Sequence, residues 1–98
     1  MGYEVILSPK ALEDLESVVS YISQDNPEAA LKFGKKLLRE VALLEISPNI
    51  GMKVPEFEDQ HIRQLIKKPY RIIYRIEEDK KRISISRFWH SSRDNLII

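Results

Sequence analysis

Apolar and polar positions alternate with two different periods along the chain, and the period changes near residue 61. Before it, apolar side chains recur every three or four residues, which is the spacing of one helix face. After it, they recur at every second residue, which indicates strands. The pattern predicts helices over residues 9–24 and 27–46, a first strand over 3–7, and later strands over 62–67, 70–76 and 82–89.

The two helices have clear start signals. Ser8-Pro9 and Asn26-Pro27 each provide an N-cap side chain followed by a proline suited to the first helical turn. The short break at residues 25–26 predicts an antiparallel helical hairpin. The expected core positions on its inner faces are Leu15, Ile22, Phe33, Leu37 and Val41, whereas Lys32, Lys35, Lys36, Arg39 and Glu40 are assigned to the solvent side.

The order of elements, β-α-α-β-β-β, predicts an α+β fold. We expect an N-terminal strand, a two-helix antiparallel hairpin and a three-stranded antiparallel meander, with the helices on one face of a mainly antiparallel sheet. Residues 51–60 contain glycine, proline and acidic residues and are expected to form a loop, and residues 77–81 a polar turn. No repeat or composition break appears, so one domain spanning residues 1–98 is expected.

Composition excludes several classes of protein. The chain has 98 residues, no cysteine, and no apolar run of the roughly 20 residues that a membrane span needs. Neither a signal peptide nor a disulfide framework is expected, and a cytoplasmic location is favoured. Two histidines without cysteine make a closed zinc site improbable, and three isolated glycines form no phosphate loop. We therefore expect no metal and no cofactor.

Charge is distributed unevenly along the chain. Residues 1–60 carry six Lys/Arg and eleven Asp/Glu, a balance of −5, whereas residues 61–93 carry ten Lys/Arg and three Asp/Glu, a balance of +7. Such asymmetry indicates an anionic partner for the basic part. The alternative is that the two parts neutralise each other within the fold.

Strand alternation predicts where the basic side chains lie. If the strands are regular, Arg63, Arg71, Arg75 and His90 share the sheet face that the helices leave free. In a regular strand Arg87 lies on the same face as the apolar residues Ile83 and Ile85, unless a bulge turns it outwards. Trp89 would lie on this same apolar face and is therefore expected in the core.

Guanidinium groups around one imidazole suit a phosphodiester. Arginine presents a fork of donors that matches phosphate oxygens, and histidine exchanges protons near neutral pH. RNA cleavage by 2′-hydroxyl attack needs such groups and no metal. The competing interpretation is structural, because arginines on an exposed sheet face protect against aggregation and a single histidine at a strand end is commonly solvated.

Short phrases in register with these elements resemble the RelE/ParE toxin superfamily over nearly the whole chain. The phrases lie at residues 11–15, 21–22, 27–30, 44–51, 63–65, 70–76, 83–85 and 89–94. The resemblance implies a cytoplasmic bacterial toxin of a type II toxin–antitoxin system, held inactive by a cognate antitoxin.

Two activities occur in that superfamily. RelE-like members are ribosome-dependent endoribonucleases that cut messenger RNA, and ParE-like members inhibit DNA gyrase and are not nucleases. The ending at residues 90–94, a histidine followed by small residues, arginine and aspartate, resembles the ParE-like branch, and no tyrosine follows Tyr74. The resemblance therefore favours gyrase inhibition without catalytic residues. The residues expected to bind the target are Arg63, Arg71, Arg75, Arg87, His90 and Arg93.

Two alternatives remain open. A RelE-like nuclease acting on the ribosome and messenger RNA would use His90, Arg71 and Arg63 in catalysis. A non-toxic remnant would only bind its antitoxin. In each case, binding of the antitoxin would form a toxin–antitoxin hetero-oligomer.

Overall fold

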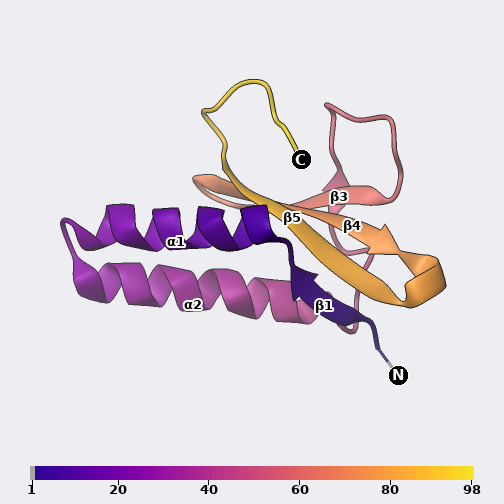
Figure 1. The fold of residues 1–98 in the computed structure, drawn as a ribbon, viewed down its shortest axis with the longest axis horizontal. Coiled ribbons are helices and arrows are strands. Elements are labelled where there is room, and N and C mark those ends of the chain that lie inside the picture. The colour runs from indigo at the N-terminus through magenta and orange to yellow at the C-terminus, as the bar shows by residue number, and fades with distance from the viewer. Residues whose placement is uncertain (1) are drawn as a thin grey trace.

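The computed structural model describes residues 2–98 and has the predicted α+β class, with a helical hairpin packed on a five-stranded sheet (Figure 1). The elements are β1 (Glu4–Leu7), α1 (Pro9–Ser23), α2 (Pro27–Leu43), β2 (Met52–Lys53), β3 (Ile62–Lys67), β4 (Tyr70–Glu77) and β5 (Arg82–His90), and a short 3-10 turn at Glu78–Lys80 joins the last two strands.

Side-chain caps fix where the helices begin. The Ser8 hydroxyl accepts a hydrogen bond from the Ala11 N–H at 3.1 Å, and the Asn26 side chain accepts one from the Ala29 N–H at 3.0 Å. The second helix is shorter than predicted. It ends at Leu43 because the following residues tighten into turns before Pro48, next to which helical backbone is disfavoured.

The strand order in the sheet is β1-β5-β4-β3-β2. The predicted antiparallel meander of β3, β4 and β5 is confirmed. The first strand pairs parallel with β5, with Glu4 opposite Arg82 and Leu7 opposite Ile85, so the whole sheet is mixed. The segment expected to be only loop contains a two-residue edge strand, β2, which pairs with β3 and was not predicted.

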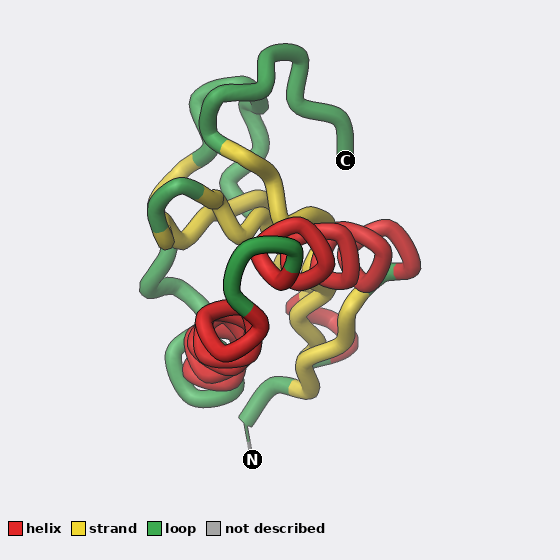
Figure 2. Tube along the Cα trace, turned by 90° about the vertical axis from the view of Figure 1, so that its left-hand side faces the viewer, coloured by secondary structure: helices red, strands yellow, loops and turns green. Residues whose placement is uncertain are grey.

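The first core lies between the helices and the sheet. Leu37 and Val41 are buried there as predicted, whereas Leu15, Ile22 and Phe33 are only partly buried and pack against its margin. Figure 2 shows the two helices nearly end-on and side by side. The hairpin therefore covers one sheet face with its inner stripe and leaves its ends more open.

A second core covers the opposite sheet face, which was wrongly predicted to be free. It consists of Val54, Ile62, Ile73, Trp89 and Leu96, with Phe57 packed against it. The loop between β2 and β3 and the C-terminal segment supply three of these side chains, and Figure 1 shows both segments on the side of the sheet away from α2. The sheet is thus covered on both faces over part of its area.

A bulge in β5 exchanges the faces of its last residues. Ile73 pairs with Arg87 but Tyr74 pairs with Ile85, so Ser86 is an extra residue without a partner. Beyond Ser86, each residue of β5 therefore points to the opposite face from the one that regular alternation would give it. Phe88 and His90 turn to the helix side, whereas Arg87 and Trp89 turn to the opposite face. The bulge thus places Arg87 on the opposite face, where it is buried. Trp89 packs in a core as predicted, but on the other face from Ile83 and Ile85.

Candidate functional site

Arg71 lies on the second-core face and is held by an acidic partner. Its Nη1 and Nη2 atoms donate to the two carboxylate oxygens of Glu56 at 2.8 Å each, and its Nε donates to Gln64 at 2.7 Å. Only 12% of the side chain is exposed. The hydrogen bonds from Arg71 lower the pKa of Glu56, so this pair is fully charged at neutral pH. Arg71 therefore fixes the loop that carries Glu56.

Arg87 is buried on the same face. It donates from Nε and Nη2 to the Asp14 carboxylate at 2.7 and 2.9 Å, and from Nη1 to the Ile97 carbonyl at 2.8 Å. The hydrogen bonds that Arg87 donates to Asp14 raise the pKa of Arg87. Asp14 also accepts from the Phe88 N–H at 3.0 Å, so one carboxylate joins α1 to β5. This arrangement is typical of a structural pair rather than of a free cation.

Arg75 is more open. It donates to Asp59 at 3.2 Å, and 42% of its side chain is exposed. The backbone N–H of His61 and the guanidinium of Arg75 lower the pKa of Asp59. All three arginines of this face therefore have a carboxylate partner. The predicted accumulation of positive charge on this face is neutralised from within the chain.

Arg63 and His90 are not on that face, contrary to the prediction. Arg63 pairs with Tyr74 in the β3–β4 register and so shares the helix side with it, where its Nη1 donates to the Gly51 carbonyl at 2.9 Å. The first strand of the meander was assigned the wrong face because its pattern is ambiguous: each of its two faces carries both apolar and polar side chains. His90 was displaced by the bulge in β5.

His90 lies at the open end of the helix–sheet interface. Its ring packs edge-on against Tyr70, with centroids 5.0 Å apart and an interplanar angle of 80°. The Ser92 N–H donates to Nδ1 at 3.1 Å, and the Ser92 hydroxyl lies 2.7 Å from the same atom. Because a backbone N–H only donates, Nδ1 is the acceptor and the neutral ring carries its proton on Nε2. Burial raises the pKa of Tyr70, which keeps its hydroxyl protonated.

Arg93 is the one predicted residue that is exposed and has no ion-pair partner among residues 2–98. Its guanidinium lies over the ring of Trp89, 4.0 Å from the centroid. The indole N–H of Trp89 donates to the Arg93 carbonyl at 3.2 Å. Stacking and this hydrogen bond hold the start of the C-terminal segment beside β5.

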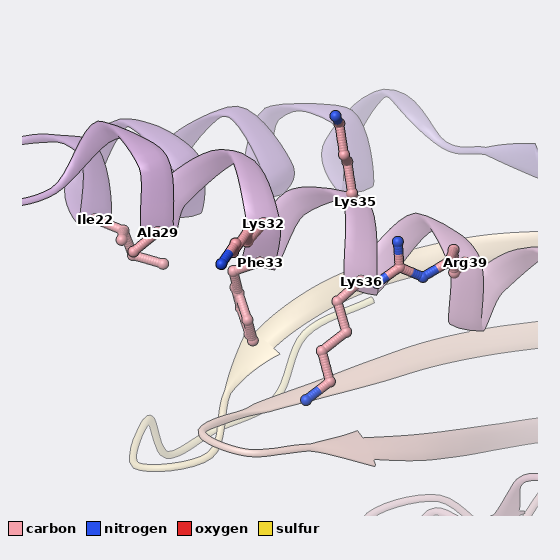
Figure 3. Close-up of a pocket in the computed structure, with 7 residues that line it drawn as sticks. All are labelled: Ile22, Ala29, Lys32, Phe33, Lys35, Lys36 and Arg39. Atoms are coloured by element: carbon pink, nitrogen blue, oxygen red, sulfur yellow. The ribbon is translucent and has the colours of Figure 1, made fainter.

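A groove beside α2 contains cations that the prediction had placed only in solvent. Its volume is about 700 Å³, and Ile22, Ala29 and Phe33 form its apolar part. Figure 3 shows Phe33 pointing towards the sheet and Lys36 extending in the same direction. The cations at the groove are Lys32, Lys35, Lys36 and Arg39. None of them forms an ion pair within residues 2–98.

The sequence contained a signal for this groove, because cations at i, i+3, i+4 and i+7 share one side of a helix. Over the part of the chain that the structure describes, no group of three or more His, Cys, Asp or Glu side chains is arranged to hold a metal ion. Within the same residues, every helix is too short or too polar to cross a membrane.

Solved structures with this fold include bacterial toxins. The chain is similar to the chromosomal ParDE system of P. aeruginosa, with 25% identity over 90% of this chain and 95% of that chain and a TM-score of 0.75. The RelBE2 complex of Mycobacterium tuberculosis is 21% identical, covers 92% and 99% of the two chains, and has a TM-score of 0.59. A mutant of E. coli RelE is 16% identical, covers 94% and 86%, and has a TM-score of 0.67. The last two likenesses concern the fold alone.

The α+β fold with a helical hairpin is thus that of the RelE/ParE toxin superfamily. The sequence profile of the ParE toxin of type II toxin–antitoxin systems matches residues 5–95, and the chain belongs to this family. No curated protein sequence matches it significantly.

Proposed function

We propose that the protein is a toxin that inhibits DNA gyrase and that a cognate antitoxin neutralises it. The proposal starts from the match to the ParE toxin family over residues 5–95 and from the likeness to the ParDE system of P. aeruginosa. It also rests on how the basic residues are used. Their arrangement favours a binding protein over a nuclease.

The observation that carries this choice is the separation of His90 from Arg71, the arginine that the nuclease alternative places with it in catalysis. A metal-free ribonuclease needs a proton-transferring group and cations around one phosphodiester. Here His90 is on the helix side of the sheet, whereas Arg71 and Arg87 are on the opposite side and bind Glu56 and Asp14. These cations are already neutralised, so they have little attraction left for a phosphate.

The residues open to a target are fewer than predicted. Arg93 is exposed, Arg75 is nearly half exposed, and His90 is partly exposed, whereas Arg71 and Arg87 are mostly covered. We expect Arg75 and Arg93 to contact gyrase. Arg71 and Arg87 act indirectly, by holding the loop and the C-terminal segment in place.

The antitoxin is expected to bind in the groove beside α2. Apolar Phe33, Ile22 and Ala29 with four uncompensated cations suit an acidic amphipathic segment, which buries its apolar side and pairs its carboxylates with the cations. A segment that is disordered alone and folds on binding can cover such a surface. The RelBE complex of E. coli, solved with its antitoxin, has the same fold.

The target is tested with the purified chain. Added to gyrase and plasmid DNA, it should inhibit supercoiling or accumulate cleaved DNA, and added to a translating extract it should leave messenger RNA intact. The His90→Gln variant should reduce gyrase inhibition only partly, since no proton transfer depends on it. Ribosome-dependent cutting of messenger RNA that disappears in His90→Gln would instead establish the nuclease. No effect on either machine would leave the non-toxic binding protein.

The antitoxin site is tested by co-expression with the protein of the adjacent reading frame. Lys32→Glu together with Lys36→Glu should weaken the complex, because charge reversal repels an acidic segment. The matched control is Lys10→Glu with Lys53→Glu, which makes the same change in net charge at exposed positions away from the groove. Equal loss of binding in both variants would contradict this location.

A further inference from the structure

Three aromatic side chains meet where the helical hairpin and the sheet open. Tyr70 lies between Phe33 of α2 and His90 of β5, with ring centroids 5.8 and 5.0 Å away. Tyr21, at the end of α1, is 71% exposed beside them. Most of the Tyr21 ring is therefore open to a binding partner.

Two adjacent cavities share these side chains. One has a volume of about 350 Å³ and is lined by Tyr21, Phe33, Tyr70, His90 and Lys68 among others. The other, of about 270 Å³, is also lined by Tyr21, Tyr70 and His90, and Arg93 is among its other lining residues. The larger one is within the size range of small-molecule sites, roughly 300–1,000 Å³.

The charge at these cavities is positive. Lys68 and Arg93 are both exposed, one at each cavity, and neither forms an ion pair within residues 2–98. The only acidic residue lining either cavity is Asp14, and Arg87 and the Phe88 N–H already occupy its carboxylate. An anionic group at either margin therefore meets a free cation and no free acid.

The polar atoms inside suit a heterocycle. His90 presents its Nε2 proton as a donor, because Nδ1 is occupied by Ser92. The hydroxyls of Tyr21 and Tyr70 both donate and accept hydrogen bonds. Flat aromatic side chains with a cation at the margin are the usual means of binding a base and its phosphate without sequence preference.

We infer that this end of the molecule binds a nucleobase together with its phosphate, with the base against Tyr21 and Tyr70 and the phosphate on Lys68. The second cavity, with Arg93, receives the neighbouring nucleotide. Two adjoining cavities with one cation each favour a single strand over a free nucleotide. A purely acidic peptide is disfavoured, because it would leave the aromatic rings without a stacking partner. The inference concerns binding only and does not depend on gyrase being the target.

The test uses the purified chain and two probes, the mononucleotide of 2-aminopurine and a short single-stranded DNA that contains this base. Stacking quenches the fluorescence of 2-aminopurine, so quenching measures contact with the rings themselves. We expect the strand to bind with a Kd between about 1 and 100 µM, which is the usual range for binding without sequence preference. Tighter binding of the strand than of the mononucleotide identifies nucleic acid as the ligand, and equal binding identifies a nucleotide.

Tyr21→Ala should weaken binding between about 5-fold and about 150-fold, as loss of one stacking side chain does, and Tyr21→Phe should restore it. Lys68→Ala should lower the salt dependence of binding by about 0.7 in the slope of log K against log salt. The controls are Leu31→Ala, which removes an apolar side chain that is 62% exposed on α2, and Lys10→Ala, which makes the same charge change elsewhere.

The inference is overturned by an absence of quenching at millimolar concentrations of either probe. It is overturned as well if Tyr21→Ala binds like the unaltered chain, or if an acidic peptide displaces the strand at equal charge concentration. Because gyrase takes no part in these measurements, their failure would leave the proposed function untouched.

Discussion

At the scale of single residues, the hydroxyl of Tyr74 connects the turn after α2 to the centre of the sheet. It donates to the Pro48 carbonyl at 2.7 Å and accepts from the Gly51 N–H at 3.0 Å, and the residue is fully buried. Burial raises the pKa of this hydroxyl, so it remains a donor throughout the neutral range. One oxygen thus satisfies two backbone groups that water cannot easily reach.

Replacing Tyr74 by phenylalanine should therefore destabilise the protein. Two backbone groups lose their partner, and an unsatisfied buried group costs about 1–3 kcal/mol. Chemical denaturation measures this loss in the free energy of unfolding. Tyr21→Phe is the control, because this exposed hydroxyl should matter by less than about 0.5 kcal/mol. Equal stability of the two variants would contradict the role of the Tyr74 hydroxyl.

The close approach of the Tyr74 hydroxyl to the backbone at residue 51 requires a glycine there. A Cβ atom at this position would lie 2.5 Å from the Tyr74 hydroxyl oxygen and 2.8 Å from the Gln64 carbonyl oxygen. Gly51→Ala should cost about 1–3 kcal/mol through overpacking. In the Tyr74→Phe background the closest clash is absent, so the double variant should be more stable than the sum of the two losses predicts, by at least about 0.5 kcal/mol. Strict additivity would show that the two residues act independently.

At the scale of elements, two ion pairs fasten the loop between β2 and β3 to β4. Glu56 binds Arg71 and Asp59 binds Arg75, and the hydrogen bonds lower the pKa of both carboxyl groups. A carboxyl group whose pKa is lower in the folded chain than in the unfolded chain stabilises the fold above its ordinary pKa. That stabilisation disappears as the pH falls through the lowered value.

The stability of the protein should therefore decline below about pH 4.5, the ordinary pKa of Glu56. Glu56→Gln should make this decline shallower, because the glutamine has no proton to gain. Denaturation curves recorded between pH 3 and 7, a range of roughly four units around that value, give the slope. Glu58→Gln is the matched control, since Glu58 is exposed in the same loop and forms no ion pair among residues 2–98. An unchanged slope in Glu56→Gln would exclude this pair as a source of the pH dependence.

Local signals were sufficient for most elements but not for their faces. The strand at residues 62–67 was predicted with its observed bounds, and the N-caps Ser8 and Asn26 gave both helix starts. The face of His90 was not predictable, because the bulge at Ser86 depends on pairing with a strand ten or more residues away. The partners of Arg71 and Arg87 are likewise distant in sequence, and only the fold brings Glu56 and Asp14 to them.

At the scale of the whole molecule, the basic part of the sequence pairs with the acidic part inside the fold. Four cations of residues 61–93 form ion pairs with acids of residues 1–60, namely Lys67 with Glu40, Arg71 with Glu56, Arg75 with Asp59 and Arg87 with Asp14. The alternative noted from the charge balance is thus correct for these residues. Among the residues that the structure describes, the cations left without an ion pair include the four at the groove beside α2, which lie in the half of the sequence that is acidic overall.

The C-terminal segment closes the second core, and its removal should expose the opposite face of the sheet. Leu96→Ala should cost about 2 kcal/mol, at the low end for a buried leucine because the residues around it in the segment are exposed. The fluorescence of Trp89, the only tryptophan, should shift to the red as its surroundings open. Ile97→Ala is the neighbouring control, since that side chain is 63% exposed. Similar effects of the two substitutions would show that Leu96 is not specifically packed.

The pairing of β1 with β5 also determines when the molecule can be completed during synthesis. Glu4 lies opposite Arg82, so the first strand made must wait for the last. A ribosome adds about 5–20 residues per second, so the delay between the two strands is roughly 4–16 s. The helical hairpin and its cationic groove can form during this interval, before the sheet is closed. An antitoxin that recognises the groove can therefore bind the nascent toxin while it is still attached to the ribosome, before a finished molecule exists to act.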